Sequence, residues 1–287
     1  MSLAELLVGA KQRLTNAGLP SPEVDAELIV AHLLGLPRGE LIPAANRGFT
    51  MKPEIQNQLW ELVRRRTSRE PLQHIIGSAP FMTFEVTVGP GVFIPRPETE
   101  SMVKRALNIL SLTGANGAKL KIADLCSGSG VIALALGREL SDARISAVEI
   151  SASAIPYLEK NVASERKKIR VEHCSVSSWG ELADASSFDM IISNPPYIPD
   201  TEVPNDPEVR DFDPREALYS GRDGLDSIRE IASLSAVILK PGGTLLIEHS
   251  NLQGQKVREI LQSRGFVNVS TGRDLAGRER FAEARRH

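Results

Sequence analysis

The chain has 287 residues, of which 41% are hydrophobic and 24% are charged, so it can bury a sizeable core and should form about two domains. Its 34 basic and 36 acidic residues give a net charge of −2, which argues against a protein whose main role is to bind the backbone of nucleic acid. The two cysteines and five histidines show neither a disulfide framework nor metal-ligand spacing, and no signal peptide or membrane-spanning run is visible, so we expect a cytoplasmic protein with no metal and no membrane partner.

Residues 1–77 are expected to form a small helical bundle. Apolar residues recur at helical spacing from Leu3 to Leu14, and Gly18 ends that run. Ser21-Pro22-Glu23 has the order of a helix start, with a capping hydroxyl, a proline and an acid, and Thr50–Arg66 predicts a further helix. No catalytic constellation occurs in this part of the sequence, so we expect a domain that docks or supports a partner.

A basic cluster, Arg64-Arg65-Arg66 with Arg69, lies at the end of that last helix. Such a patch could bind nucleic acid in spite of the neutral total charge. We interpret it instead as the solvated end of a helix, where basic side chains interact favourably with the helix dipole.

Residues 78–97 have the pattern of a β-hairpin and are expected to link two domains. Apolar and polar residues alternate from Phe81 to Val88. Gly89-Pro90-Gly91 is then expected to turn the chain into a second strand at Val92–Ile94.

Residues 98–287 alternate between apolar strand candidates and helical segments. Repeated strand–helix units are typical of a mostly parallel sheet with helices on both faces, as in Rossmann-like α/β folds. The strand candidates are 120–125, 144–150, 169–174, 188–193, 244–249 and 266–270.

The strongest local signal is the loop Asp124-Leu125-Cys126-Ser127-Gly128-Ser129-Gly130, which connects a buried strand to a helix. Glycine lets a backbone approach a ligand where a Cβ would clash, and Asp124 can accept hydrogen bonds from an ammonium group or from loop amides. A Gly-x-Gly loop also occurs where glycine is needed only for packing. The loop alone is therefore weak evidence for a ligand.

A second acid strengthens the interpretation. Glu149 ends the next strand, about twenty residues later, where an acid accepts from the ribose hydroxyls of an adenosine. The alternative is a surface acid that caps the helix starting near Ser151. NAD is the rival cofactor, but the third glycine of its fingerprint is replaced by Ala133, so the loop is closer to the class I methyltransferases, which use S-adenosylmethionine.

The chemistry is expected at Asn194-Pro195-Pro196-Tyr197, which directly follows the strand 188–193. An amide or exocyclic amine nitrogen is a poor nucleophile because its lone pair is delocalised. The side-chain oxygen of Asn194 and the carbonyl of Pro195 could accept from both N–H groups, while Pro196 stiffens the backbone and Tyr197 offers a flat face to the planar group. The other reading is a strand that ends in a proline turn.

With these motifs the chain resembles the HemK/PrmC family of peptide chain release factor glutamine methyltransferases. The resemblance covers nearly the whole length. The fold that it implies is α/β, a Rossmann-like class I S-adenosylmethionine-dependent methyltransferase with a mostly parallel seven-stranded sheet, plus an N-terminal helical domain at 1–77, a β-hairpin linker at 78–97 and a catalytic domain at 98–287. The further matching segments are 69–77, Phe93–Glu100, Ala217-Leu218 and Asp223-Gly224-Leu225.

The resemblance implies a role for each matching residue. The segment Phe93–Glu100 is expected to close over cofactor and substrate, with Phe93 and Arg96 facing the site, and Trp179 is expected to flank the adenine. Two departures stand out, since Cys126 replaces a more usual glycine and Ser178 replaces a more usual acid before Trp179. The expected catalytic residues are Asn194, Pro195 and Tyr197; substrate binding adds Pro196; and the expected cofactor-binding residues are Phe93, Arg96, Thr99, Asp124, Cys126, Ser127, Gly128, Ser129, Gly130, Glu149, Trp179 and Asn194.

The substrate implied by the resemblance is the glutamine of the Gly-Gly-Gln motif in class I peptide chain release factors. Three alternatives stay open. These are a methyltransferase that acts on a ribosomal-protein glutamine, an adenine methyltransferase of DNA or RNA, and a binding module that has kept the fold without turnover. The low net charge argues against direct binding of nucleic acid.

Overall fold

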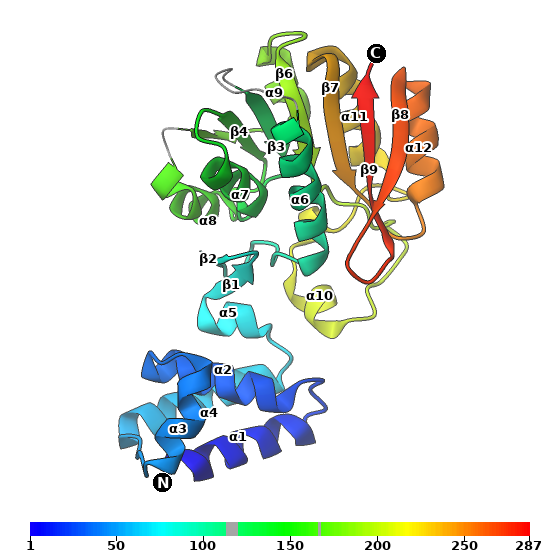
Figure 1. The fold of residues 1–287 in the computed structure, drawn as a ribbon. Coiled ribbons are helices and arrows are strands. Elements are labelled where there is room, and N and C mark those ends of the chain that lie inside the picture. The colour runs from blue at the N-terminus through cyan, green and yellow to red at the C-terminus, as the bar shows by residue number, and fades with distance from the viewer. Residues whose placement is uncertain (113–119, 166–167) are drawn as a thin grey trace. The chain divides into compact units, whose positions relative to one another are not determined.

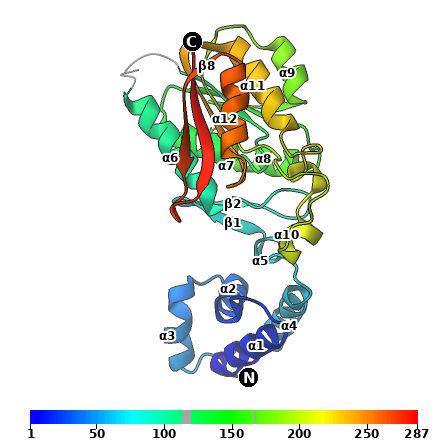
Figure 2. The same cartoon turned by 90° about the vertical axis from the view of Figure 1, so that its right-hand side faces the viewer.

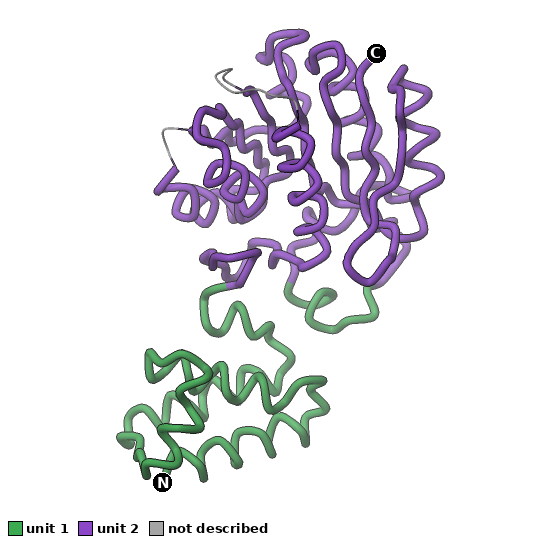
Figure 3. Tube along the Cα trace, viewed as in Figure 1, with its two compact units in different colours: residues 1–78, 204–212 green, residues 79–203, 213–287 purple. Residues whose placement is uncertain are grey.

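The computed structural model describes residues 1–112, 120–165 and 168–287 (Figure 1, Figure 2). The chain divides into two compact units (Figure 3). Unit 1 contains residues 1–78 and 204–212, and unit 2 contains residues 79–203 and 213–287. Residues 204–212 belong to unit 1 although they come only seven positions after Tyr197, so this unit is discontinuous in sequence.

Unit 1 is a helical bundle. Its apolar core includes Leu3, Leu6 and Leu59, each fully buried. Ser2 and Glu5 form a reciprocal capping box at the first helix. The predicted cap Ser21 makes no side-chain hydrogen bond, so the proline and the acid after it mark the start of the second helix. The elements are α1 (Leu3–Asn16), α2 (Pro22–Leu34), η1 (Arg38–Glu40), α3 (Leu41–Asn46), α4 (Pro53–Thr67), α5 (Leu72–Ile76) and, from the later segment, α10 (Pro207–Phe212).

The basic cluster at the end of α4 is not uniformly solvated, so our interpretation was wrong for Arg66. The Arg66 side chain is 4% exposed and its Nε lies 2.7 Å from Oδ2 of Asp25, while its Nη2 lies 2.9 Å from a carboxylate oxygen of Glu208 in α10. By contrast Arg64 is exposed and pairs with Glu61 of its own helix. A buried cation needs such partners, and removing one of them typically costs about 3–5 kcal/mol.

Unit 2 begins with a hairpin whose turn lies earlier than predicted. Strands β1 (Ser78–Phe81) and β2 (Phe84–Thr87) pair with each other, and Met82, at φ 51°, starts the turn between them. The segment Gly89–Gly91 is a separate loop and Val92–Ile94 forms no strand. A Cβ at Gly91 would lie 2.8 Å from the Cβ of Ser153, so glycine there permits close packing and does not mark a hairpin turn.

The main sheet has seven strands in the order β5-β4-β3-β6-β7-β9-β8, which confirms the predicted fold class. The first five in this order are parallel, and β9 is antiparallel to both of its neighbours. The strands are β3 (Lys121–Leu125), β4 (Arg144–Glu149), β5 (Ile169–His173), β6 (Phe188–Ser193), β7 (Leu239–Glu248), β8 (Phe266–Arg273) and β9 (Glu279–Arg286).

Helices cover both faces of this sheet and enclose a core on each (Figure 1, Figure 2). One core contains side chains of α6 (Pro97–Leu112), α7 (Val131–Glu139) and α8 (Ile155–Asn161). The other contains side chains of α9 (Val176–Leu182), α11 (Asp226–Ile238) and α12 (Gly254–Ser263). Short 3-10 turns lie at η2 (Ala163–Glu165) and η3 (Arg215–Ala217).

The described helices of residues 1–112, 120–165 and 168–287 differ from membrane-spanning helices in length and composition. No single helix there is both long and apolar enough to span a bilayer, and one pair, α2 with the segment Arg38–Asn46, meets that criterion only with a 92° bend between its members.

Candidate active site

The site lies at the carboxyl ends of four parallel strands. Strands β3, β4, β6 and β7 end at Leu125, Glu149, Ser193 and Glu248. In open α/β sheets this edge is where ligands bind. The predicted cradle loop, the second acid and the Asn-Pro-Pro-Tyr motif therefore meet at one edge of the sheet.

The cradle loop turns through left-handed backbone at alternate residues. Cys126 has φ 59°, Gly128 has φ 54° and Gly130 has φ 82°. A Cβ at Gly130 would lie 2.4 Å from Cδ1 of Leu158, whereas a Cβ at Gly128 would meet nothing within 4 Å. The packing explanation for glycine therefore holds for Gly130, and Gly128 leaves open space at the mouth of the loop, as a ligand cradle requires.

The conformation of Cys126 explains why glycine is the more usual residue there. The position is left-handed, a region that costs an L-residue with a Cβ on the order of 1 kcal/mol. The departure from the family pattern is thus a matter of backbone strain and not of side-chain size.

Asp124 is fully buried at the start of this loop. Its Oδ2 accepts a hydrogen bond of 3.0 Å from the backbone N–H of Ala133, and its Oδ1 has no donor within the part of the chain that the structure describes. Burial raises the pKa of Asp124 to about 7. A nearby cation would relieve this penalty. Beside it, Ser127 donates to the Asp124 carbonyl and the Ser129 carbonyl accepts from Asn161, so both serines hold the loop in place.

Glu149 joins two loops and is not the surface acid of the alternative reading. It is 7% exposed; Oε2 accepts from the N–H of Gly128 at 2.7 Å, and Oε1 accepts from the N–H of Ser151 at 2.8 Å. Each oxygen keeps a lone pair for a further donor. Across the described residues neither Glu149 nor Asp124 pairs with a basic side chain, so the cradle is acidic, which suits a cationic cofactor and disfavours the pyrophosphate of NAD.

The Asn-Pro-Pro-Tyr motif presents two acceptors. The Nδ2 of Asn194 donates to Oγ1 of Thr99 at 3.3 Å, which leaves Oδ1 directed elsewhere. Neither this Oδ1 nor the carbonyl of Pro195 accepts a hydrogen bond from any residue in the described ranges. A planar N–H₂ group could donate to both of them.

The same motif is held in place by two of the segments that match the family, at Leu218 and Gly224, and by Gln253. Ile198 donates to the carbonyl of Leu218 at 2.8 Å, and Gln253 donates to the carbonyl of Tyr197 at 2.9 Å. Gly224 has φ 74°, and a Cβ there would lie 2.3 Å from the Tyr197 carbonyl. Glycine is therefore required where this loop touches the motif.

The segment after the hairpin contributes three predicted residues. The ring of Phe93 lies 5.2 Å from the guanidinium carbon of Arg96, and Arg96 forms a 2.7 Å ion pair with the buried carboxylate of Asp213. Thr99 is 2% exposed, and its hydroxyl contacts Asn194 and Glu248. These contacts give Thr99 a structural role beside Asn194, and its predicted binding of the cofactor stays a prediction.

The structure does not bring Trp179 to this cluster. Its ring packs edge-on against Phe188 at 5.3 Å and is 5% exposed. It lines a cavity with Lys121 and Arg144, the first residues of β3 and β4, whereas the cradle follows the ends of those strands. Its helix is capped by Ser175, which accepts from the N–H of Ser178, so Ser175 and not Trp179 stands near the strand end.

Sequence reasoning missed Glu248. This acid is 2% exposed at the last position of β7, where it accepts from Thr99 at 2.8 Å and from the hydroxyl of Tyr197 at 3.5 Å. The signal was present, since an acid that ends an apolar parallel strand must lie at the ligand edge of the sheet. We had read the segment 244–249 only as a strand.

The chain matches two family models and several proteins of known name. Residues 5–77 match the model of the PrmC N-terminal domain, and residues 90–206 match that of the methyltransferase small domain. The chain is 43% identical over 279 residues to a release factor glutamine methyltransferase of Streptomyces coelicolor, covering 96% of this chain and 95% of that protein. A protein of the same name from Corynebacterium glutamicum is 40% identical, covering 100% of this chain and 99% of that one.

The chain belongs to the release factor glutamine methyltransferase family. The resemblance predicted from the motifs is therefore confirmed. The fold is also that of a solved structure, the 16S rRNA N2 G1207 methyltransferase of T. thermophilus with AdoMet and guanosine, at a TM-score of 0.53 and 21% identity over 73% of this chain and 50% of that one.

Membership of this family makes the chain an S-adenosylmethionine-dependent methyltransferase, as the cradle predicted. The acidic cradle fits this cofactor, which carries a sulfonium and an ammonium group. In the described part of the chain no group of three or more histidine, cysteine or acidic residues could hold a metal ion.

Proposed function

We propose that this release factor glutamine methyltransferase transfers the methyl group of S-adenosylmethionine to the side-chain amide nitrogen of a glutamine in a peptide chain release factor. By resemblance, that glutamine is the one in the Gly-Gly-Gln motif of class I factors. The names of the relatives support the choice of protein substrate. The observation that carries the chemistry is the pair of acceptors at Asn194 and Pro195 that have no donor among the described residues.

The two acceptors address the central difficulty of the reaction. An amide nitrogen is weakly nucleophilic because its lone pair is shared with the carbonyl. If Oδ1 of Asn194 and the carbonyl of Pro195 accept from both N–H groups, they fix the nitrogen and increase its electron density while it attacks. Tyr197 can cover the planar face of the amide, and because burial raises the pKa of Tyr197, its hydroxyl stays protonated.

The bond changes balance without a metal or a redox partner. The cofactor, when bound, supplies an electrophilic methyl on a positively charged sulfur. An N–CH₃ bond forms as the S–CH₃ bond breaks, and one amide proton leaves to solvent. The products are S-adenosylhomocysteine and an N-methylated glutamine. Within the chain, Asp124 and Glu149 are proposed to hold the cationic and ribose parts of the cofactor, while Cys126, Ser127, Gly128, Ser129 and Gly130 shape the loop around it.

Phe93 and Arg96 are proposed to cover the site from the segment after the hairpin. The ion pair of Arg96 with Asp213 and the stacking of Phe93 support this role, because both hold the segment in a defined conformation. Unit 1, with its matching N-terminal domain, is proposed to bind the release factor. Because release factors act in translation, we place the enzyme in the cytoplasm and expect no direct contact with nucleic acid.

The assignment is tested with radiolabelled S-adenosylmethionine and three candidate substrates in parallel. These are a purified class I release factor, total ribosomal proteins and nucleic acid. We expect label on the release factor, and no label on a release factor whose motif glutamine is replaced by alanine. Label on ribosomal protein or on nucleic acid alone would replace our proposal by one of the two enzymatic alternatives. Cofactor binding without label on any candidate substrate would favour the binding module.

A further inference from the structure

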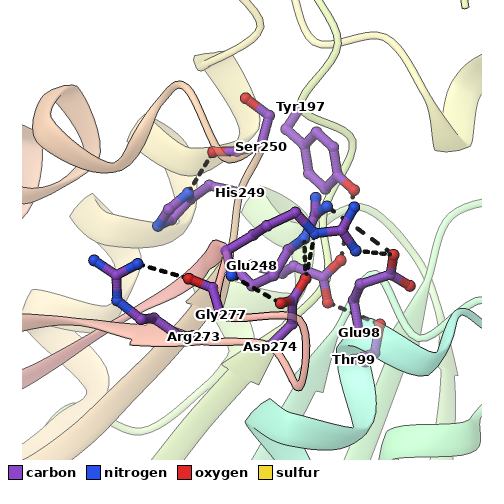
Figure 4. A network of polar contacts seen from close by, with 11 residues as sticks. Glu98, Thr99, Tyr197, Glu248, His249, Ser250, Arg273, Asp274 and Gly277 are labelled. Carbon is purple, nitrogen blue, oxygen red and sulfur yellow. Dashed lines mark hydrogen bonds and ion pairs between the residues drawn. The ribbon is translucent and has the colours of Figure 1, made fainter.

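A chain of hydrogen bonds leads from the Asn-Pro-Pro-Tyr motif to the buried acid Glu248, and Figure 4 shows the part of it around Glu248, with Thr99 and Tyr197. Asn194 Nδ2 lies 3.3 Å from Thr99 Oγ1, which lies 2.8 Å from Oε2 of Glu248. The other carboxylate oxygen of Glu248 is 3.5 Å from the hydroxyl of Tyr197. Glu248 thus contacts both the residue that supports Asn194 and the aromatic residue of the motif.

The direction of these hydrogen bonds follows from the ionised acid. A carboxylate can only accept, so the hydroxyl of Thr99 must donate to it. The Thr99 oxygen is then available only as an acceptor toward Asn194. That acceptor favours the amide rotamer in which Nδ2 faces Thr99 and Oδ1 faces the opposite side, where the substrate nitrogen must be held.

We propose that Glu248 is a positioning residue that sets the orientation of the Asn194 amide through the hydroxyl of Thr99. The inference rests on the proposed function, because it concerns how the same asparagine grips the substrate amide. Glu248 touches neither substrate nor cofactor in this account. It acts by fixing which end of the Asn194 side chain faces the substrate amide.

Protonation of Glu248 removes the constraint on the direction of these hydrogen bonds. A neutral carboxylic acid can donate, so Thr99 no longer has to direct its own proton toward Glu248, and the amide of Asn194 loses its preferred orientation. Burial raises the pKa of Glu248 to about 7. The oriented form is therefore the ionised form, present above about pH 7 and lost below it.

Several charged groups surround this acid. Glu98, in the first turn of α6, raises its pKa further, while Arg280 of β9 and the hydrogen bonds from Thr99 and Tyr197 act in the opposite direction. Arg280 is itself shared, since its Nε lies 3.3 Å from Asp274 and its Nη2 lies 4.0 Å from Glu98. The cluster also includes Arg278, which pairs with Glu98 and Asp274, and His249, which follows Glu248 in the chain.

The test compares steady-state kinetics of four variants with the wild type, at saturating S-adenosylmethionine and from about pH 6 to about pH 8. Glu248→Gln replaces the titratable carboxylate by a neutral amide of similar shape. Thr99→Val removes the hydroxyl at constant shape, and Thr99→Ser keeps it. Glu283→Gln is the control, since Glu283 is a half-buried acid of β9 that pairs with Arg105 outside this network.

We expect the wild-type kcat to rise about tenfold over this range, following ionisation of a group with a pKa near 7. Glu248→Gln should lose about tenfold in kcat at about pH 8 and show a flat profile, with the affinity for S-adenosylmethionine unchanged. The kcat of Thr99→Ser should be at least about tenfold higher than that of Thr99→Val, because the valine variant loses the directing hydrogen bond. Glu283→Gln should keep the wild-type profile.

Two outcomes would overturn the inference. One is a Glu248→Gln enzyme that keeps the wild-type rate and pH profile, and the other is equal activity of Thr99→Val and Thr99→Ser. Either result would leave the proposed function intact, because the wild-type enzyme in the same assay would still methylate the release factor. Failure of the wild type to do so would reject the function itself.

Discussion

The cradle after β3 and the Asn-Pro-Pro-Tyr motif after β6 lie on neighbouring strands but are built by different means. The cradle uses charge and unusual backbone, with two acids that have no basic partner in the described chain and left-handed residues at 126, 128 and 130. The motif has no charged side chain of its own. It uses proline rigidity and hydrogen bonds of fixed direction.

This difference separates binding from catalysis. An acidic cradle attracts a cationic cofactor in its ground state, so changes there should appear mainly in cofactor affinity. Neutral acceptors aimed at an amide matter most as the nitrogen attacks, so changes in the motif should appear mainly in kcat. Each region has one buried carboxyl with a pKa near 7, Asp124 in the cradle and Glu248 behind the motif. The two acids should therefore affect different kinetic constants.

The sharpest test of this separation is Asn194→Ala. We expect kcat to fall by at least ~100-fold, as for the loss of one preorganised polar contact to the reacting group. The dissociation constant for S-adenosylmethionine should stay within about threefold of the wild type, corresponding to less than one net hydrogen bond. Calorimetric titration with cofactor, beside single-turnover methylation of release factor, measures both. A variant that turns over at the wild-type rate would remove Asn194 from the mechanism.

A smaller effect is expected in the cradle when pH is varied. A cationic ligand prefers the ionised form of Asp124, whose pKa lies near 7 in the free protein, so affinity for S-adenosylmethionine should increase about tenfold from about pH 6 to about pH 7.5. Isothermal titration calorimetry measures this. The variant Asp124→Asn cannot ionise and should show weaker, pH-independent binding. If the wild-type affinity is flat over this range, the cradle does not recognise the cofactor by charge.

The smallest expected effect concerns Cys126. Because the residue is left-handed, Cys126→Gly should raise the free energy of unfolding by about 0.5–1 kcal/mol. The matched control is Cys174→Gly, where φ is not positive and glycine should cost about 0.5–1 kcal/mol through backbone entropy. Urea denaturation compares the two. Equal destabilisation by both changes would show that the backbone of the cradle is not strained at Cys126.

The sequence allowed the fold class to be predicted because the information was local. Strand 188–193 was placed at its observed bounds since it is a mainly apolar segment followed by Asn-Pro. Strand β9 was not located, because Glu279, Arg280, Glu283 and the last arginines look like a solvated segment. In the structure these charges have partners across space, such as Arg105 for Glu283. Such partners cannot be read from neighbouring residues.

The site shows the same limit. Asp124, Glu149 and Asn194 were found because each lies at the end of an apolar strand or directly after it. Arg66 was misread because its environment depends on Glu208, which lies far away in the sequence. Glu248 could have been placed at the ligand edge from its position at the end of a strand, but its contact with Thr99 depends on long-range packing. Trp179 was assigned to the cofactor from the family pattern alone, and the structure packs its ring against Phe188. The surroundings of these three residues are set by contacts between segments far apart in the sequence, which local patterns do not reveal.

The central claim is that Asn194 and Pro195 grip a glutamine amide. Its most direct test is mass spectrometry of the motif peptide from a release factor expressed together with this enzyme, either wild type or Asn194→Ala. The account predicts the mass of one methyl group on the glutamine side chain with the wild type and an unmodified peptide with the variant. An unmodified peptide with the wild type, or full methylation by the variant, would contradict it.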